Sequence, residues 1–183
     1  MQDALARLVD RAAIHDLLSR YCRGVDRKDW PAVRACFHPD AYDDHAEYKG
    51  NVDGFIAWVT RRHQHVPQSM HFLGNCLIEF ASSDLAAVET YFLALQRLGA
   101  DAGPALSMID GGGKGAVDVT VVGRYIDRME RRQGEWRIAR RTVTFDVIRT
   151  APAAGPELKP DWAQTTRDGN DPVFANRRAV GLG

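Results

Sequence analysis

The sequence has few cysteines and no long apolar run. Cys22, Cys36 and Cys76 are three among 183 residues, widely separated, and each lies in an apolar context. This spacing predicts buried thiols in a reducing compartment, and it disfavours a disulfide framework or a zinc site. No apolar stretch approaches the ~20 residues that a membrane-spanning helix needs, and no charged leader precedes an apolar segment at the N-terminus. We therefore expect a cytoplasmic protein with no membrane partner.

The sequence also lacks an excess of charge. Lys and Arg total 24 and Asp and Glu total 24, so the formal net charge is zero, and the sequence pI is near 7.0. Basic doublets such as Arg61-Arg62 and Arg131-Arg132 are scattered among acids, so no basic surface indicates nucleic acid as a partner. With 45% hydrophobic residues, the chain is long enough for one domain with a sizeable core.

Two motifs with reactive residue types do not meet the spacing of known sites. The stretch from His38 to His45 is rich in His and Asp but contains neither His-x-His nor His-Glu-x-x-His. We therefore expect it at a surface or pocket rim, with no metal, where Asp44 or His45 could touch a ligand. The glycine run 111–115, which includes Lys114, lacks the Ser or Thr of a phosphate-binding loop. A flexible lid is the better interpretation of that run.

The first third of the sequence has the three- and four-residue spacing of helices. It predicts three helices, at Asp3–Val25, Lys28–Cys36 and Val52–His65. Asp29 is the expected N-cap of the second helix, Pro31 lies in its first turn, and Pro67 lies just beyond the third. Between the second and third helices we expect a turn at Phe37–Asp40, a short strand at Ala41–Tyr48 and a turn at Gly50-Asn51.

From Ser69 onward the period changes to two. Four long strands are predicted, at Ser69–Phe80, Ala86–Leu98, Ala116–Met129 and Glu135–Ile148. Helices followed by antiparallel strands make an α+β fold, in which the helices cover the concave face of a strongly curved sheet and leave a pocket inside. We expect residues 1–148 to form this domain. Residues 149–183, rich in Pro, Gly and charge, are expected to form an extended arm on the domain or on a neighbour.

Asp26 is a charged residue at the edge of an apolar helix face. That face is predicted from Leu5, Leu8, Val9, Ala12, Ala13, Leu17, Leu18, Tyr21, Cys22 and Val25, whereas Asp10 falls toward solvent. A carboxylate in an apolar interior is costly unless another group pairs with it. The candidate partners are His71, Tyr21 and Arg141.

Strand alternation suggests which side chains share the pocket. In the first long strand, His71 and Asn75 lie on a mixed face, whereas the face from Met70 to Phe80 is wholly nonpolar and suits packing. Arg141 lies among apolar neighbours in the last strand, and Tyr91 lies in the second, so both could meet Asp26, His71 and Tyr21 at one cavity. Each residue also has a structural explanation, as a satisfied histidine, a helix cap, a core tyrosine or a sheet salt bridge.

Several separated motifs resemble SnoaL-like proteins of the nuclear-transport-factor-2-like superfamily, whose fold is a cone-shaped α+β barrel. The opening of these proteins is matched by Arg11-Ala12-Ala13-Ile14-His15-Asp16-Leu17, Tyr21, Gly24-Val25-Asp26 and Asp29-Trp30. Their histidine strand is matched by Met70-His71-Phe72, Asn75 and Glu79-Phe80, and their last hairpin by Gly123-Arg124-Tyr125, Glu130-Arg131-Arg132, Gly134, Trp136-Arg137-Ile138 and Arg140-Arg141. The resemblance covers roughly residues 5–148.

Within this superfamily the sequence is most similar to the subgroup that includes scytalone dehydratase, bile-acid 7-alpha-dehydratase and hexachlorocyclohexane dehydrochlorinase. The resemblance implies an Asp-His dyad for elimination at Asp26 and His71, with Tyr21 and Arg141 as further functional residues. Tyr91 falls near the position where scytalone dehydratase uses a second His, so that helper differs here. The subgroup further implies a homo-oligomer, a trimer or dimer, and no metal or organic cofactor.

The sequence therefore predicts a cofactor-independent, dehydratase-like lyase acting on a small apolar or polycyclic substrate. His71 would be the general base, because histidine side chains ordinarily titrate near ~6.5, and Asp26 would fix its tautomer. Tyr21 and Tyr91 would hydrogen-bond a carbonyl, and Arg141 would assist the leaving group or bind a carboxylate. The expected substrate contacts are Tyr91, Tyr42, Asp44, Trp58, Asn75, Tyr125 and Phe145. Two alternatives stay open: an isomerase that uses the same base, and a noncatalytic module that binds a small molecule.

Overall fold

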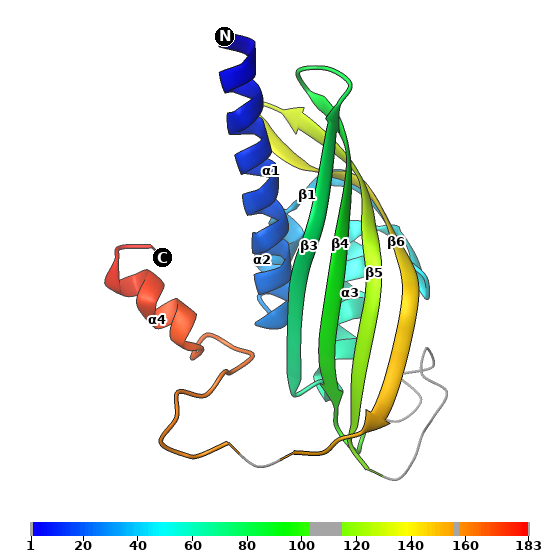
Figure 1. Cartoon of the computed structure of the whole chain (residues 1–183), viewed down its shortest axis with the longest axis vertical. Helices are drawn as coiled ribbons and strands as arrows, with labels where there is room; N and C mark the ends of the chain where they lie inside the picture. The colour runs from blue at the N-terminus through cyan, green and yellow to red at the C-terminus, as the bar shows by residue number, and fades with distance from the viewer. Residues whose placement is uncertain (1, 103–114, 156–157, 183) are drawn as a thin grey trace.

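The computed structural model describes residues 2–102, 115–155 and 158–182 of the chain (Figure 1). The helices among these residues are α1 (Gln2–Asp26), α2 (Trp30–Ala35), α3 (Val52–Arg62) and α4 (Pro172–Ala179), with a short 3-10 helix, η1 (His63–His65), after α3. The strands are β1 (Phe37–His45), β2 (Tyr48–Asn51), β3 (Gln68–Phe80), β4 (Leu85–Leu98), β5 (Val117–Arg132) and β6 (Glu135–Pro152). The predicted α+β class is confirmed.

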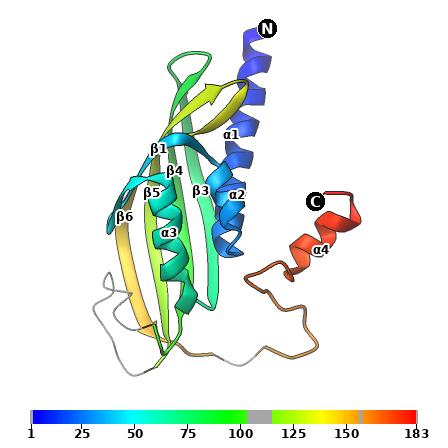
Figure 2. The ribbon, with the colours of Figure 1, turned by 180° about the vertical axis from the view of Figure 1, so that it is seen from behind.

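The six strands form one curved sheet in the order β2-β1-β6-β5-β4-β3. All neighbours are antiparallel except β1 and β6, which run parallel. Within the described residues, β2 and β3 are the two edges, so the sheet does not close into a barrel. Its strong curvature and the helices along it give the cone-like shape of the predicted fold (Figures 1 and 2).

Two short predictions around β1 and β2 are wrong. The predicted turn at Phe37–Asp40 is the start of β1, because this segment pairs with β6 and the Ile138 backbone N–H donates to the Cys36 carbonyl at 2.9 Å. Gly50 and Asn51 belong to β2, and the Asn51 side chain caps α3 by accepting from the Gly54 N–H. Both segments are strands because they pair with strands of the sheet, and the local preference of their residues for turns does not indicate this pairing.

The predicted N-terminal cap of α2 is confirmed. The Asp29 carboxylate accepts a hydrogen bond from the Ala32 N–H at 3.1 Å, and Pro31 occupies the first turn. This cap turns the chain sharply after α1, so that α2 and β1 pack beside the end of α1 that carries Asp26.

The first helix differs from its prediction at its start. Leu5, Leu8 and Val9 are exposed, although these turns lie beside the β3–β4 hairpin, where Arg7 Nη1 donates to the Ser82 carbonyl at 2.9 Å. Asp10, expected in solvent, is buried and accepts hydrogen bonds from Trp136 Nε1 and Arg131 Nη1, each at 2.9 Å. The predicted apolar stripe packs in the second half of the helix, where Ile14, Leu17, Leu18, Tyr21, Cys22 and Val25 are buried.

Irregularities in strand pairing bend the sheet. The register shifts between Leu73 and Cys76 on β3, and between Val122 and Gly123 on β5. A Cβ atom at Gly123 would lie 2.1 Å from the Thr144 carbonyl oxygen, so a side chain there would push β5 and β6 apart. Such shifts bend and twist strands, and here they produce the hollow inner face. Helix α3 lies across that face, and α1 runs beside β3 (Figure 2).

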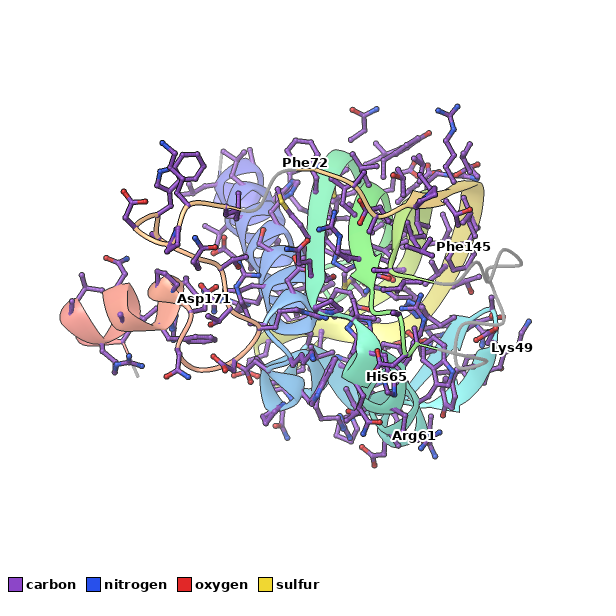
Figure 3. All side chains as sticks on the ribbon, turned by 90° about the horizontal axis from the view of Figure 1, so that it is seen from below. Lys49, Arg61, His65, Phe72, Phe145 and Asp171 are labelled. Carbon is purple, nitrogen blue, oxygen red and sulfur yellow. The ribbon has the colours of Figure 1, made fainter. Side chains whose placement is uncertain are left out.

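The predicted C-terminal arm is partly ordered structure. Its first residues continue strand β6 as far as Pro152, and its last part forms helix α4, which stands beside α1 (Figure 3). The Asp171 side chain caps α4 by accepting from the Val173 N–H and also pairs with Arg27 Nε at 2.9 Å. The predicted division of the chain at residue 148 remains a prediction.

The expected lid, in the glycine run 111–115, lies outside the described residues except for Gly115. No described helix combines the length and the apolar character that crossing a lipid bilayer requires.

Candidate active site

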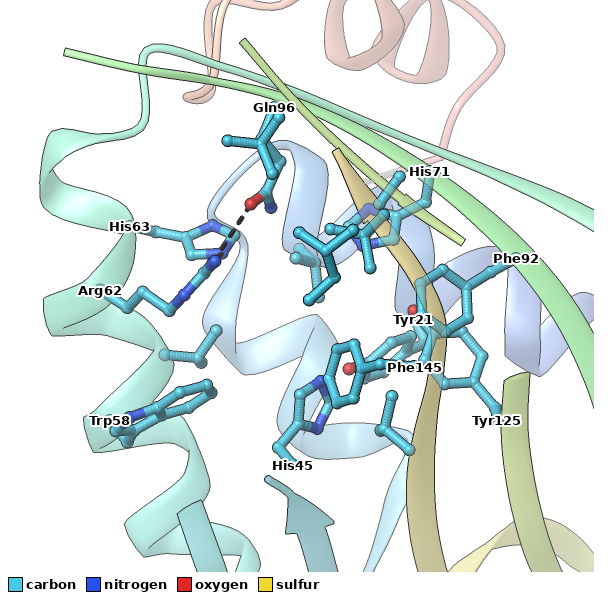
Figure 4. A pocket seen from close by; sticks show the side chains of 17 residues that line it. Tyr21, His45, Trp58, Arg62, His63, His71, Phe92, Gln96, Tyr125 and Phe145 are labelled. Atoms are coloured by element: carbon cyan, nitrogen blue, oxygen red, sulfur yellow. Dashed lines mark hydrogen bonds between the residues drawn. The ribbon is translucent and has the colours of Figure 1, made fainter. Parts of the chain in front are cut away.

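A chamber opens between α3, the end of α1 and the inner face of the sheet (Figure 4). Its empty volume is about 650 Å³, including the open mouth. Most of its walls are apolar, from Val25, Trp58, Val59, Phe92, Ala94, Val119, Val121, Val143, Phe145 and Ile148. The polar lining residues are Tyr21, His45, Arg62, His63, His71, Gln96 and Tyr125. An apolar chamber with a few directed polar groups is typical of a small-molecule site.

Asp26 and His71 meet at the wall of this chamber. Asp26 ends α1, and His71 lies on the inward face of β3, 45 residues later in the chain. His71 Nδ1 lies 2.7 Å from Asp26 Oδ1, and the His71 backbone N–H donates to Asp26 Oδ2 at 2.8 Å. Two contacts to one carboxylate fix both the position of the strand and the orientation of the ring.

The Asp26 carboxylate is held in its charged form. Burial alone would raise the pKa of Asp26, but the hydrogen bonds from His71 and Ser69 lower it below its usual value. Ser69 Oγ donates to Asp26 Oδ1 at 2.9 Å and in turn accepts from Gln96 Nε2 at 3.4 Å. Because a carboxylate can only accept, the proton of neutral His71 lies on Nδ1, and Nε2 keeps its lone pair.

Arg141 lies behind the chamber and does not line it. Its side chain has no exposed surface and binds Asp127 through two hydrogen bonds, from Nε at 2.8 Å and from Nη2 at 2.7 Å. The guanidinium lies against the rings of both Tyr21 and Tyr125, 4.2 and 4.1 Å from their centroids. Burial alone would lower the pKa of Arg141, but the Asp127 carboxylate raises it well above its usual value.

Tyr21 and Tyr125 connect this buried ion pair with the chamber. Both line it and are almost fully buried, with their ring centroids 5.7 Å apart in an edge-to-face arrangement. Burial raises the pKa of both tyrosines, so their hydroxyl groups keep their protons and can donate hydrogen bonds.

A second imidazole–carboxylate pair lies on the chamber wall. His45 Nδ1 lies 2.9 Å from Asp43 Oδ1, and Asp43 is fully buried. The His45 ring stacks on Phe55 with centroids 5.0 Å apart, which orients its remaining nitrogen. The sequence interpretation assigned His45 to a surface or rim. The i, i+2 spacing of Asp43 and His45 on a strand was the available signal, since such residues share a face.

Arg62, His63 and Gln96 form a polar group at the end of α3. Arg62 Nη1 donates to Gln96 Oε1 at 3.2 Å and lies 3.3 Å from His63 Nε2 (Figure 4). Arg167, from the C-terminal arm, reaches the other ring nitrogen of His63, with Nη2 2.9 Å from Nδ1. None of these four residues was predicted as part of the site.

Comparison of the sequence with protein families identifies the family of this chain. A model of the SnoaL-like domain matches residues 6–142. The chain belongs to the SnoaL-like domain family. The match confirms the predicted resemblance and ends within β6, so the whole predicted C-terminal arm, residues 149–183, lies beyond it.

Solved structures share the SnoaL-like fold with this chain. A hexachlorocyclohexane dehydrochlorinase, LinA type 2, is 22% identical with a TM-score of 0.68, covering 86% of this chain and 98% of that one. A provisionally named scytalone dehydratase from Novosphingobium aromaticivorans is 20% identical with a TM-score of 0.66, covering 88% and 97%.

A third neighbour carries a different description. A provisionally named aromatic ring hydroxylase from the same organism is 25% identical with a TM-score of 0.64, covering 79% of this chain and 94% of that one. Curated proteins give no match to this sequence. Identities this low establish the shared fold and leave the reaction to be argued from the site.

The predicted site residues fall into two groups, those at the chamber and those away from it. Asp26, His71, Tyr21, Trp58, Tyr125 and Phe145 lie at the chamber, Asp26 through its bond to His71. Tyr91, Asn75, Tyr42, Asp44 and Arg141 are not among its lining residues.

The outlying residues each have a local reason for their position. Tyr91 is 45% exposed on the outer face, 5.9 Å from the Arg124 guanidinium, because its neighbour Phe92 takes the inward position. Asn75 lies in the register shift of β3 and is exposed. Tyr42 stacks under Arg140 at 4.6 Å, and Asp44 pairs with Lys49 at 3.1 Å.

Proposed function

We propose that this SnoaL-like protein is a cofactor-independent lyase that eliminates water or another small leaving group from a small apolar substrate. The observation that carries the proposal is the His71–Asp26 pair at the wall of an apolar chamber. Within the described residues, His71 Nε2 makes no hydrogen bond, so its lone pair is free to accept a proton from a bound molecule.

His71 acts as the general base. Its Nε2 takes a proton from the carbon next to the one that carries the leaving group. The electrons of that C–H bond form the carbon–carbon double bond, and the leaving group departs with the electrons of its own bond. Asp26 stabilises the imidazolium that forms, because its Oδ1 accepts a hydrogen bond from the His71 Nδ1–H, with 2.7 Å between the two atoms. Proton transfer of this kind is typically worth ~10²–10⁴ in rate.

An elimination also needs a proton for the departing group. His45 is the candidate, because it lines the chamber and its Nδ1 contact with Asp43 Oδ1 leaves Nε2 for the substrate. His45 would give that proton to departing hydroxide, which leaves as water, while His71 holds the proton taken from carbon. Exchange with solvent then restores both imidazoles.

Tyr21 supports the charge that develops on the substrate. Because its hydroxyl stays protonated, it can donate to a substrate carbonyl as an enolate forms. Arg141 is fully buried and bound to Asp127, so we assign it no contact with the leaving group. Its contact with Tyr21 and Tyr125 makes it a residue that orients both rings.

Substitution of the pair tests the proposal. Small cyclic alcohols and halides are first screened by mass spectrometry for loss of water or hydrogen halide. On a substrate found in this way, we expect His71→Ala and Asp26→Asn each to reduce kcat by ~10²-fold or more. His65→Ala is the matched control, because His65 also pairs with an aspartate, Asp101, at 3.0 Å but lies outside the chamber. Near-normal turnover in His71→Ala would remove the pair from the mechanism.

The role of His45 has its own readout. We expect His45→Gln to slow elimination of water more than elimination of chloride, because chloride needs no proton to leave. Equal effects on the two leaving groups would remove His45 as the acid.

The two alternatives give different results in the same assay. An isomerase would return a product of unchanged mass with a shifted double bond, and its formation would still depend on His71. A noncatalytic binding module would retain ligands without chemical change in both the wild type and His71→Ala.

A further inference from the structure

The chamber holds a guanidinium that has no close carboxylate partner among the residues that the structure describes. Arg62 is half-buried at the end of α3 and lines the chamber (Figure 4). Its contacts are with uncharged groups, Gln96 Oε1 at 3.2 Å and His63 Nε2 at 3.3 Å. Among the described residues, no carboxylate oxygen lies within the 4.0 Å of an ion pair to Arg62. Arginines in apolar surroundings are ordinarily paired with an acid.

His63 cannot satisfy Arg62, because a second guanidinium competes for it. Burial lowers the pKa of His63 well below its usual value, and the charges of Arg62 and Arg167 lower it further, so the ring is neutral. A neutral imidazole has one lone pair and one N–H. Arg167 Nη2 is the closer donor, at 2.9 Å from Nδ1, so it takes the lone pair. Nε2 then carries the proton and faces the Nη1 donor of Arg62.

The charges around this group add to a local excess of positive charge. Arg167 binds the backbone carbonyls of Val25, Asp26 and Val66, and burial lowers its pKa to about 10. Burial also lowers the pKa of Arg62, and the charge of Glu47 opposes this effect only in part. The nearby acid, Asp26, is already bound by His71 and Ser69.

We propose that Arg62, with the side chain of Gln96 beside it, binds the carboxylate of the substrate. The ligand class is a flat, apolar ring compound with one carboxylate: the apolar walls take the ring, and the anion satisfies the Arg62 donors that His63 leaves unbound. A guanidinium forms paired hydrogen bonds with a carboxylate that an amide cannot match. This inference rests on the proposed use of the chamber as a substrate site, and it names the class of substrate.

A matched pair of ligands tests the inference by equilibrium binding. The probes are trans-cinnamate and its neutral analogue trans-cinnamamide, measured at pH 7.5 by calorimetry, or by the change in tryptophan fluorescence, since Trp58, one of four tryptophans, lines the chamber. We expect wild-type protein to bind cinnamate about 10- to 100-fold more tightly than cinnamamide, as a charge-assisted hydrogen bond implies. Arg62→Met should abolish this preference, and Arg62→Lys should keep part of it.

Arg61→Met is the matched control, because Arg61 is adjacent on α3, exposed, and not part of the chamber lining. It should bind both probes as the wild type does. Equal affinity of the wild type for the two probes, no saturable binding of cinnamate, or a preference that survives in Arg62→Met would each overturn the inference. The comparison of probes in the wild type holds even if Arg62→Met fails to fold.

Binding and catalysis separate in the His71→Ala variant. We expect this variant to keep the preference for cinnamate, because Arg62 is intact. Loss of turnover with retained preference supports both proposals. Retained preference in a protein whose turnover does not depend on His71 supports the carboxylate site and rejects the lyase mechanism.

Discussion

Asp127 and Arg141, on neighbouring strands, bind each other through two parallel hydrogen bonds with neither side chain exposed to solvent. Removal of one partner leaves a buried charge without compensation. We expect Asp127→Ala to lower the free energy of unfolding by about 3–5 kcal/mol. The double variant Asp127→Leu, Arg141→Met should recover most of that loss. Urea denaturation measures the free energy of unfolding of the single and the double variant. Arg34→Met, which removes the exposed Arg34–Asp53 pair, is the control and should change little. A single variant as stable as the wild type would contradict the prediction.

His63 predicts a pH dependence of stability. Its pKa in the folded protein lies well below the usual value of 6.5, so below pH ~6.5 the unfolded chain binds a proton that the folded protein does not. The contribution of neutral His63 to the free energy of unfolding is therefore complete above that pH. It declines as the pH falls, by up to ~1.4 kcal/mol per pH unit. The measurement is denaturant unfolding of the wild type and His63→Gln between pH 7 and 5. The wild type should lose stability faster, and parallel curves would count against the prediction.

Arg167 links the C-terminal arm to the end of α1. It makes four contacts, with the carbonyls of Val25, Asp26 and Val66 and with the ring of His63. Because hydrogen bonds to charged groups are worth about 1.5–3 kcal/mol, we expect Arg167→Met to lower the free energy of unfolding by at least that amount. It should also reduce kcat, because the backbone carbonyl of Asp26 loses its hydrogen bond from Arg167. Arg178→Met, at an exposed position of α4, is the control. If the two variants unfold alike, the arm does not stabilise the site.

The outer face of the sheet predicts self-association. Phe72, Leu93, Val122 and Val147 form one row across four strands, and Phe72 is 62% exposed (Figure 3). Monomeric proteins rarely expose large contiguous apolar patches. We expect a dimer or trimer by light scattering after size exclusion, and a monomer for Phe72→Lys. Leu182→Lys, at an exposed position outside the sheet, should keep the oligomer. A monomeric wild type would refute the prediction.

Much of the fold could be predicted because its signals are local. Strands β3–β6 agree with the predicted ones within a few residues at each end, since their two-residue alternation is long and regular. The proximity of Asp26 and His71 was also anticipated, from a charge at the edge of an apolar helix face and from the family resemblance. These signals lie in the sequence itself.

The inward face of each strand was harder to predict. On β4 both faces are largely apolar, so alternation alone could not decide between Tyr91 and Phe92. On β3 the register shift after Leu73 moves Asn75 out of the pattern. Arg167 lies in a tail without periodicity, and its contacts are with backbone carbonyls that any sequence provides.

Gly123 shows how strongly the shape of the site depends on the absence of a side chain at one position. The hollow inner face exists because β5 and β6 approach each other where this residue has no side chain. Even one added methyl group would meet the Thr144 carbonyl oxygen at 2.1 Å and the Phe92 ring at 3.0 Å, so the two strands and a residue of the chamber wall would have to move. The capacity to hold a small molecule is thus set by backbone geometry at a position that itself touches no ligand.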